Sequence, residues 1–480
     1  MKNLSKYIII LISSVIAALL AAFFLKIAPV IALTIIIFIA FILAIFKSPI
    51  FGIFLVAFLL PFERIGSYDI AGITVRASQI FALIALVAWI LIFLAKKKNF
   101  DAKNPILIPI SFFVAISSLS IIKAVNFQRA ILVFLFSAFV IAIALMIPNL
   151  VKRKEHLDKI IKIILISCFV VSCFGIYQFL GDVAGLSPSL TGLREHYTSE
   201  VFGFPRVQST CLEPLYFANY LLIPISLCLA LLSGKKEGSR FSIRPLYLVL
   251  ILGLASVNLI LTLSRGGYLG FVTVIFLSLI VFFRSFFTWR KVLIFILIIL
   301  VAFISVYYFL KLAGRKEALE TFLRQATNIT QGPAVVERTS AYEEAWKLFK
   351  EHPWLGIGVG NFGPVYAEHS QIIPEEIGWP IVNNEFLEIL AEVGIFEFLS
   401  FLAFIVVLIV YSIRAIKLTK DSYLKTILIG LLIAFCGILV QYQTFSTLYI
   451  LHIWFLIGLM IAVSNLGFKN QVYEKQGFQD

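Results

Sequence analysis

Charged residues are scarce in this sequence. Asp, Glu, Lys and Arg together make up 14% of the 480 residues, whereas 61% are hydrophobic. A soluble domain carries about 25% charged residues, so this chain has too little polar surface to be a water-soluble globule. Its apolar runs are about 17 to 22 residues long, the length of a membrane-crossing helix, whereas membrane barrel strands are about half as long and alternate in polarity. We therefore expect an all-α fold, a polytopic helical bundle in a membrane.

Cysteine is also rare, and the cysteines do not indicate a metal site. The cysteines do not form pairs at metal-ligand spacing and lie in or beside apolar runs, so we expect small buried hydrophobic residues and neither zinc nor redox chemistry. No metal and no cofactor are expected. The first apolar run, 7–25, lacks a small-residue cleavage site and is followed by further runs, which predicts a retained helix. The cysteines are Cys168, Cys173, Cys211, Cys228 and Cys436.

Apolar runs separated by polar breaks predict about 14 transmembrane helices. We find no repeat of fixed period and no low-complexity linker. The sequence predicts transmembrane helices over 1–311, a long extracytoplasmic loop with a helical lid over 312–383, and C-terminal helices with a short cytoplasmic tail over 384–480. The expected helix cores are 7–25, 28–46, 50–62, 80–95, 105–122, 130–150, 160–180, 214–233, 245–263, 268–284, 292–311, 385–411, 424–442 and 446–466.

The basic residues indicate orientation. The net charge is +14, from 40 Lys and Arg against 26 Asp and Glu. In a membrane protein such an excess marks cytoplasmic loops rather than a nucleic acid site. Every second loop carries it, so these loops and both termini are expected in the cytoplasm. The basic loops are 96–98, 152–154, 235–244, 284–291 and 414–425.

Four arginines lie on the opposite side against this bias: Arg194, Arg206, Arg265 and Arg338. One guanidinium group can donate two parallel hydrogen bonds to a phosphate, so each of these arginines is a candidate anion ligand. An equally good interpretation is a solvated arginine near a helix end. Arg265 is the sharpest case because apolar segments flank it almost without a loop, which places its charge at the hydrocarbon edge. The following Gly266 and Gly267 allow a tight turn and close backbone approach.

A second candidate segment runs from Phe204 to Pro214. Its Arg206 is a candidate ligand for a second phosphate. Its Glu213 precedes an apolar helix and is either a general base with a raised pKa or a carboxylate that caps the helix through its dipole. Tyr216 follows in that helix and is expected to line the cavity.

The long outer loop has two segments with helical periodicity, Lys316–Thr327 and Glu337–Lys350. The second has an apolar face, which predicts a surface helix docked as a lid over the cavity. The glycines at 356, 358 and 360 lack the Lys-Ser/Thr of a phosphate-binding P-loop, so we interpret them as turns.

A row of carboxylates follows this loop. Glu385, Glu388 and Glu392 recur at helical spacing at the mouth of a predicted span, so they share a face that is expected to line a wet cavity. His196 and His369 lie on the outer side and can titrate near neutral pH, or are ordinary surface histidines.

The order of these features resembles the O-antigen ligase and polymerase family of bacterial membrane glycosyltransferases. The similarity spans about residues 200 to 400. The matching segments are Arg206 in a loop before a span, Leu263–Gly267 between two spans, Trp346–Phe362 in the long loop, and Asn384–Ile395 after it.

The resemblance implies a GT-C type glycosyltransferase of the bacterial cytoplasmic membrane, acting on the outer face without nucleotide sugar or metal. Its donor would be a glycan on polyprenyl diphosphate, with the diphosphate held by Arg206 and Arg265, with Arg338 as a further candidate. An acceptor hydroxyl of a glycan or lipid would attack the anomeric carbon. A chain-length regulator or a flippase would be further partners.

The chain departs from the family pattern at one position. Ligases usually carry His-Asn before the helix, whereas this sequence has Asn383-Asn384. Asparagine cannot accept a proton at physiological pH, so the catalytic position has no histidine base. Glu213 or His369 would substitute, or the transition state needs little base help.

The missing histidine and the Glu213-Pro214 pair favour a polymerase of repeat units over a ligase. A transporter or flippase is an alternative, since about 14 helices also describe many carriers, but inverted repeats are not evident. A non-catalytic scaffold is a further alternative.

Overall fold

The computed structural model describes residues 29–65, 67–70, 73–95, 104, 106–234, 243–283, 300, 304, 308, 333–370, 379–446 and 448–475. The expected spans at 7–25 and 292–311 and the segment Lys316–Thr327 lie outside these residues.

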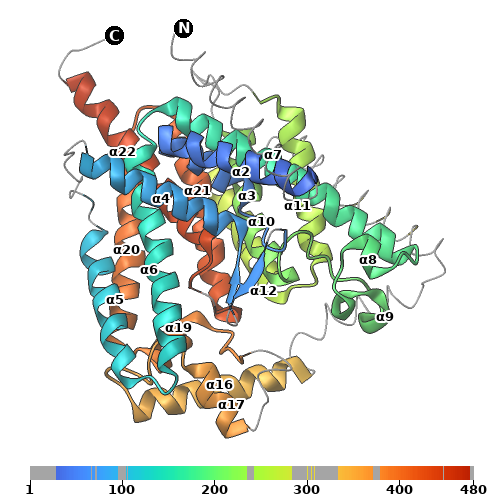
Figure 1. The fold of residues 1–480 in the computed structure, drawn as a ribbon. Coiled ribbons are helices and arrows are strands. Elements are labelled where there is room, and N and C mark those ends of the chain that lie inside the picture. Colours follow the sequence, from blue (N-terminus) through green and yellow to red (C-terminus); the bar gives the residue numbers. More distant parts are fainter. Residues whose placement is uncertain are drawn as a thin grey trace.

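The described chain is a helical bundle with one short β hairpin (Figure 1). Its longer helices are α2 (Pro29–Lys47), α3 (Pro49–Leu59), α4 (Ala77–Ala95), α5 (Leu107–Ser120), α6 (Phe127–Leu150), α7 (Lys154–Val183), α10 (Pro214–Ser233), α11 (Pro245–Leu261), α12 (Arg265–Val281), α16 (Pro333–Glu351), α20 (Ile395–Leu418), α21 (Ser422–Gln441) and α22 (Leu451–Lys475). Shorter helices are α8 (Pro188–Thr191), α9 (Ser199–Phe202), α17 (Phe362–Ser370) and α19 (Glu385–Glu392).

Seven of these helices are long and apolar enough to cross a membrane: α4, α6, α7, α10, α20, α21 and the first part of α22. Five shorter apolar helices accompany them within the described residues. The structure thus confirms the prediction of a membrane-type helical bundle. The count of about 14 spans stays a prediction.

Helices of similar apolarity occupy different places in the bundle. The apolar window of α22 is 89% buried and that of α10 is 78% buried, whereas that of α4 is 28% buried. Helix α10 packs against α21, α11 and α12, and α22 packs against α6, α21 and α20. Side chains such as Leu91 and Leu94 of α4 are exposed although they are apolar. Such a surface is suited to lipid contact, so α10, α21 and α22 form the protein-lined centre.

Two sets of loops meet at opposite ends of the bundle. Lys154 forms an ion pair with Asp421, which joins two loops that the charge pattern placed on one side. Helix α16 lies across the other end, opposite the C-terminal end of α22 (Figure 1). The alternation of basic and non-basic loops therefore agrees with the way the described loops are grouped.

The structure corrects the purely helical prediction. Strands β1 (Tyr68–Ile70) and β2 (Ile73–Val75) form an antiparallel hairpin in which Tyr68 pairs with Val75. The β-branched residues Ile70, Ile73, Thr74 and Val75 favour strands over helix. This hairpin carries the chain from α3 to α4.

The expected span at 385–411 is wrong as one helix. It divides into α19 and α20 at Gly394, whose φ is 86° and whose N–H donates to the carbonyl oxygen of Ile389 at 3.1 Å. Glycine adopts this left-handed conformation without a Cβ clash and so ends the first helix. As a result the acidic part and the membrane part of this segment are separate helices.

The cysteines behave as predicted with one exception. Cys168, Cys211 and Cys228 are buried and Cys436 is partly buried, but Cys173 is exposed on α7. The helical period turns Cys173 away from the face that holds Cys168 and Val171.

Candidate functional site

The loop 203–213, between α9 and α10, is held rigidly by its main chain. The N–H of Val207 donates to the carbonyl oxygen of Leu261 at 3.0 Å. The side-chain amide of Gln178 binds Ser209 twice, accepting from its N–H at 2.8 Å and donating to its carbonyl oxygen at 3.1 Å. Ser209 has a φ of 51°, which a residue with a side chain rarely adopts. These contacts give Arg206 a defined position.

Arg206 reaches from this loop to the end of α11. Its Nε donates to the carbonyl oxygen of Thr262 at 3.3 Å, and its guanidinium lies 5.5 Å from the ring centre of Tyr197. Burial lowers the pKa of Arg206, whereas Tyr197 and Glu213 counteract this effect. The charge of Arg338 also lowers the pKa, and it is the smallest of these influences. Two such cations stabilise an anion placed between them.

The break between α11 and α12 turns at Leu263, whose φ is 49°. Ser264 then caps α12 by accepting the N–H of Gly267 at 3.2 Å. Arg265, partly buried, is the first residue of α12, at the end of the break to which Arg206 is bonded. Gly266 and Gly267 do not form the turn as predicted. They lie inside the helix and permit close packing against α10 and the segment after α21.

Glu213 stands at the N-cap position of α10, and its side chain makes no capping hydrogen bond there. The capping interpretation is therefore not supported by a contact. Burial raises the pKa of Glu213, while Arg194 and Arg206 counteract the rise and Glu63 adds to it. A partly buried carboxyl group beside arginines can hold a proton taken from a hydroxyl group.

Helix α16 brings Arg338 to this place from a distant part of the chain. The hydroxyl of Tyr342, one turn further on, donates to the carbonyl oxygen of Asn383 at 3.2 Å and to that of Gln443 at 3.1 Å. Ala341, Ala345 and Leu348 are buried on the same helix. The predicted docked helix over Glu337–Lys350 is confirmed, and it extends over Pro333–Glu351.

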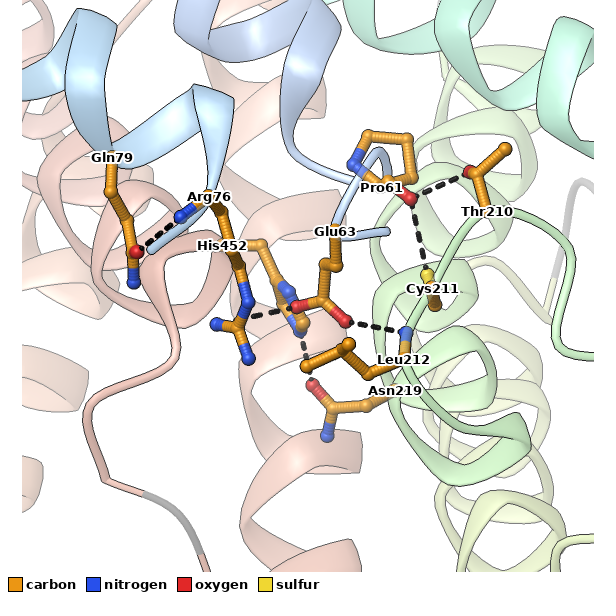
Figure 2. A network of polar contacts seen from close by, with 9 residues as sticks. All are labelled: Pro61, Glu63, Arg76, Gln79, Thr210, Cys211, Leu212, Asn219 and His452. Carbon is orange, nitrogen blue, oxygen red and sulfur yellow. Dashed lines mark hydrogen bonds and ion pairs between the residues drawn. The ribbon is translucent and has the colours of Figure 1, made fainter. Parts of the chain in front are cut away.

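A buried ion pair that the sequence analysis did not select lies behind this loop (Figure 2). Glu63 is 3% exposed and Arg76 is 8% exposed, and Oε1 of Glu63 lies 3.7 Å from Nη1 of Arg76. The guanidinium of Arg76 lies 6.0 Å from the ring centre of Tyr216. The signal in the sequence was a pair of opposite charges that flank a short hairpin.

The acidic row after the long loop lines a separate cavity of about 40 Å³. This volume suits water rather than a sugar ring. Among the described residues, no group of three or more His, Cys, Asp or Glu side chains has the arrangement of a metal site. Tyr216 was expected in this cavity but is not among its lining residues. Its charged lining residues are Arg129, Glu385, Glu388, Glu392 and Glu397.

The predicted glycine turns are confirmed, and the amide of one of these glycines holds a side-chain carboxyl group. Gly356, Gly358 and Gly360 have φ values of 62°, 101° and 72°. The carboxylate of Glu392 accepts the N–H of Gly360 at 2.6 Å and the N–H of Phe362 at 2.9 Å. A side chain of the same protein thus occupies the place that a bound phosphate takes in a nucleotide loop.

The structure also places the remaining predicted residues. Asn384 caps α19 by accepting the N–H groups of Phe386 and Leu387. Asn383 has a φ of 59°, which asparagine tolerates. His369 is exposed on α17 and contacts Glu344 at 2.7 Å, a pair at the surface. The structure therefore brings together Arg206, Arg338 and Glu213 near the start of α12, but not His369.

Residues 248–402 match the family model described as O-Antigen ligase. The match begins in α11, includes Arg265 and Arg338, and ends in α20. It supports the predicted resemblance and an activity of the O-antigen ligase or polymerase type. Arg206 and Glu213 precede the matched region. No curated protein matches this chain.

Proposed function

From the match of residues 248–402 to the O-antigen ligase family, we propose that this membrane protein is a polysaccharide polymerase. It transfers a glycan from polyprenyl diphosphate to a hydroxyl group of an acceptor glycan at the outer face of the bacterial cytoplasmic membrane. The observation that carries the proposal is this match, and the charges of Glu213 and Arg338, which both act on Arg206, support it.

The arginines bind the diphosphate of the donor. Arg206 and Arg338 supply two cations from different elements, and Arg265 supplies a third from the start of α12. Positive charge at the leaving group stabilises the transition state, because negative charge builds up on the diphosphate as the bond to the anomeric carbon breaks. This arrangement requires no nucleotide.

Glu213 accepts the proton of the acceptor hydroxyl. The hydroxyl oxygen forms a bond to the anomeric carbon, and the bond from that carbon to the diphosphate oxygen breaks. The lipid diphosphate leaves with the bonding electron pair, and the proton passes to the Glu213 carboxylate. Burial raises the pKa of Glu213, which makes the carboxylate a stronger base than one in water.

Helix α16 covers this place as part of a lid. Its docking through Tyr342 brings Arg338 to Arg206, so donor binding and lid closure depend on the same helix. The lid over 312–383 remains a proposal, since only 333–370 and 379–383 of it are described.

A ligase is the second candidate, because the matched family model carries that description. A ligase uses the same donor and differs in the acceptor. Deletion of the protein and analysis of polyprenyl-linked glycans separates the alternatives. Single repeat units accumulate if a polymerase is lost, and long chains accumulate if a ligase is lost. Absence of lipid-linked glycan at the outer leaflet points to a transporter and overturns the proposal.

The proposed orientation places Glu195 outside and Lys154 in the cytoplasm. Single cysteines at these exposed positions test it with a membrane-impermeant maleimide. Both cysteines are introduced into a chain in which Cys173, the exposed native cysteine, is replaced by Ser, so that this residue does not react. Labelling of intact cells at 195 and not at 154 supports the orientation, and the reverse pattern contradicts it.

A further inference from the structure

We propose that Glu63 is a positioning residue for Glu213 and that Arg76 balances the buried charge of Glu63. The inference rests on the proposed function, because it concerns the orientation of the candidate base.

The turn after α3 and the loop before α10 are joined by a set of hydrogen bonds (Figure 2). The hydroxyl of Thr210 donates to the carbonyl oxygen of Pro61 at 2.7 Å, and the thiol of Cys211 contacts the same oxygen at 3.3 Å. The N–H groups of Glu63 and Arg64 both donate to the carbonyl oxygen of Thr210, at 3.0 Å and 2.9 Å. The two segments therefore behave as one unit although about 150 residues separate them in sequence.

The side chain of Glu63 contacts the residue directly before the candidate base. Its Oε2 accepts the N–H of Leu212 at 3.2 Å, and Leu212 directly precedes Glu213. On the other side, Arg76 lies over the ring of Tyr216, in the first turn of α10. Glu63 and Arg76 thus contact residues on both sides of Glu213, and a shift of either one moves the start of α10.

A second buried polar group supports the same helix. Nε2 of His452, on α22, lies 2.7 Å from Oδ1 of Asn219, and the amide of Asn219 donates to Oε1 of Gln441 at 3.0 Å. These contacts link α10 to α21 and α22. The part of α10 beyond Glu213 is therefore fixed independently. The bonds of Ser209 and Thr210 hold the loop before it, and the Glu63 contact holds Leu212, directly beside Glu213.

The energetics argue for a role beyond stability. Replacing a buried ion pair with apolar side chains is often neutral or stabilising, because two charges must be removed from water. Here the pair is loose at 3.7 Å, and Nε of Arg76 makes no hydrogen bond to the described residues. A pair with such geometry contributes little to folding. Its specific contribution is the Glu63 oxygen that meets the N–H of Leu212.

Two double variants isolate this contact. Glu63→Leu/Arg76→Met and Glu63→Gln/Arg76→Met both remove the charge pair, but only the second keeps an acceptor for the N–H of Leu212. The substrate is polyprenyl-linked glycan extracted from cells that lack the protein. We expect kcat of the Gln double variant to exceed that of the Leu double variant about 10-fold or more, with KM for the donor within about 3-fold, since small displacements of a reacting group reduce kcat strongly. Equal kcat values overturn the inference.

A conservative variant covers the case in which the double variants do not fold. Glu63→Asp keeps the charge but withdraws the carboxylate by one methylene, so it should lower kcat at normal protein level. Unchanged kcat in Glu63→Asp also overturns the inference.

A readout without catalysis separates this inference from the proposed function. If the wild-type protein does not extend the extracted glycan, the proposed function fails. The position of residue 213 is then measured by the rate of maleimide labelling of Glu213→Cys. This substitution is combined with Cys173→Ser and with each of the two double variants. A labelling rate that differs between the Leu and Gln backgrounds supports positioning by Glu63, and equal rates contradict it.

Discussion

The carboxylate of Glu392 accepts the main-chain N–H of Gly360 at 2.6 Å. This contact closes the glycine-rich turn onto α19, and the side chain of Arg129 adds a hydrogen bond from its Nε to the carbonyl oxygen of Gly360 at 2.6 Å. This turn, 356–360, follows α16 in the chain and contacts α5, α6 and α19. Its shape therefore affects how α16 is supported.

Substitution of Gly358 should therefore destabilise the protein. Its φ is 101°, and a Cβ atom would lie 2.6 Å from Cα of Ala124. Gly185 is a matched control, because its φ is 85° and nothing lies within 4 Å of the Cβ position. We expect Gly185→Ala to cost about 1 kcal/mol and Gly358→Ala about 2 to 4 kcal/mol. Thermal unfolding in detergent compares the two, and equal midpoints would contradict the tight packing of the turn.

Loss of either arginine near Glu213 should reduce glycosyl transfer. We expect Arg206→Ala and Arg338→Ala each to lower kcat/KM about 100-fold or more, as removal of a group that stabilises developing charge does. If both bind one diphosphate, the double variant should lose less than the sum of the single effects in free energy. Arg153→Ala, in an exposed loop beside the Lys154–Asp421 pair, is the control. If cells with Arg206→Ala and cells with Arg338→Ala both still make long polymer, the two arginines do not bind the diphosphate.

The pH dependence of kcat should report Glu213. A base must be ionised, so activity falls as pH drops through its pKa, and burial raises that pKa above the ordinary value of about 4.3. Arg194 counteracts the rise, so Arg194→Ala should raise the pKa and move the acidic limb to higher pH. Arg194→Lys keeps the charge and should leave the limb near its wild-type position. An unmoved limb in Arg194→Ala, or near-normal activity in Glu213→Gln, would remove Glu213 from the mechanism.

Removal of the Tyr342 hydroxyl should loosen the lid helix. Tyr342→Phe removes the one O–H hydrogen that the carbonyl oxygens of Asn383 and Gln443 share, a loss of about 1 kcal/mol. Local opening of α16 should become about 5-fold more frequent, which hydrogen exchange of Glu337–Lys350 measures. Tyr177→Phe is the control, because its hydroxyl donates to the carbonyl oxygen of Leu190, outside α16. Unchanged exchange in α16 would show that this hydroxyl does not hold the helix.

The sequence predicted much of the site because the chain offers few polar residues among its apolar runs. Arg206 and Arg265 were identified by their position at breaks between predicted spans, and the helix over Glu337–Lys350 by its period. Glu63 and Arg76 escaped notice, since only the hairpin between them brings their side chains together. The sequence could not show which charged group Tyr216 meets, because its proximity to Arg76 depends on the packing of α10 against the hairpin segment.

By itself the sequence determined that this chain is a membrane helical bundle, because hydrocarbon thickness dictates the length of apolar runs. Tertiary structure alone decided which loops meet. The hydrogen bonds of Tyr342 to Asn383 and Gln443 and the contact of Glu63 with the loop before Glu213 both depend on packing between distant segments. Local composition does not predict such packing, because the packing depends on the shapes of surfaces that become neighbours only in the folded chain.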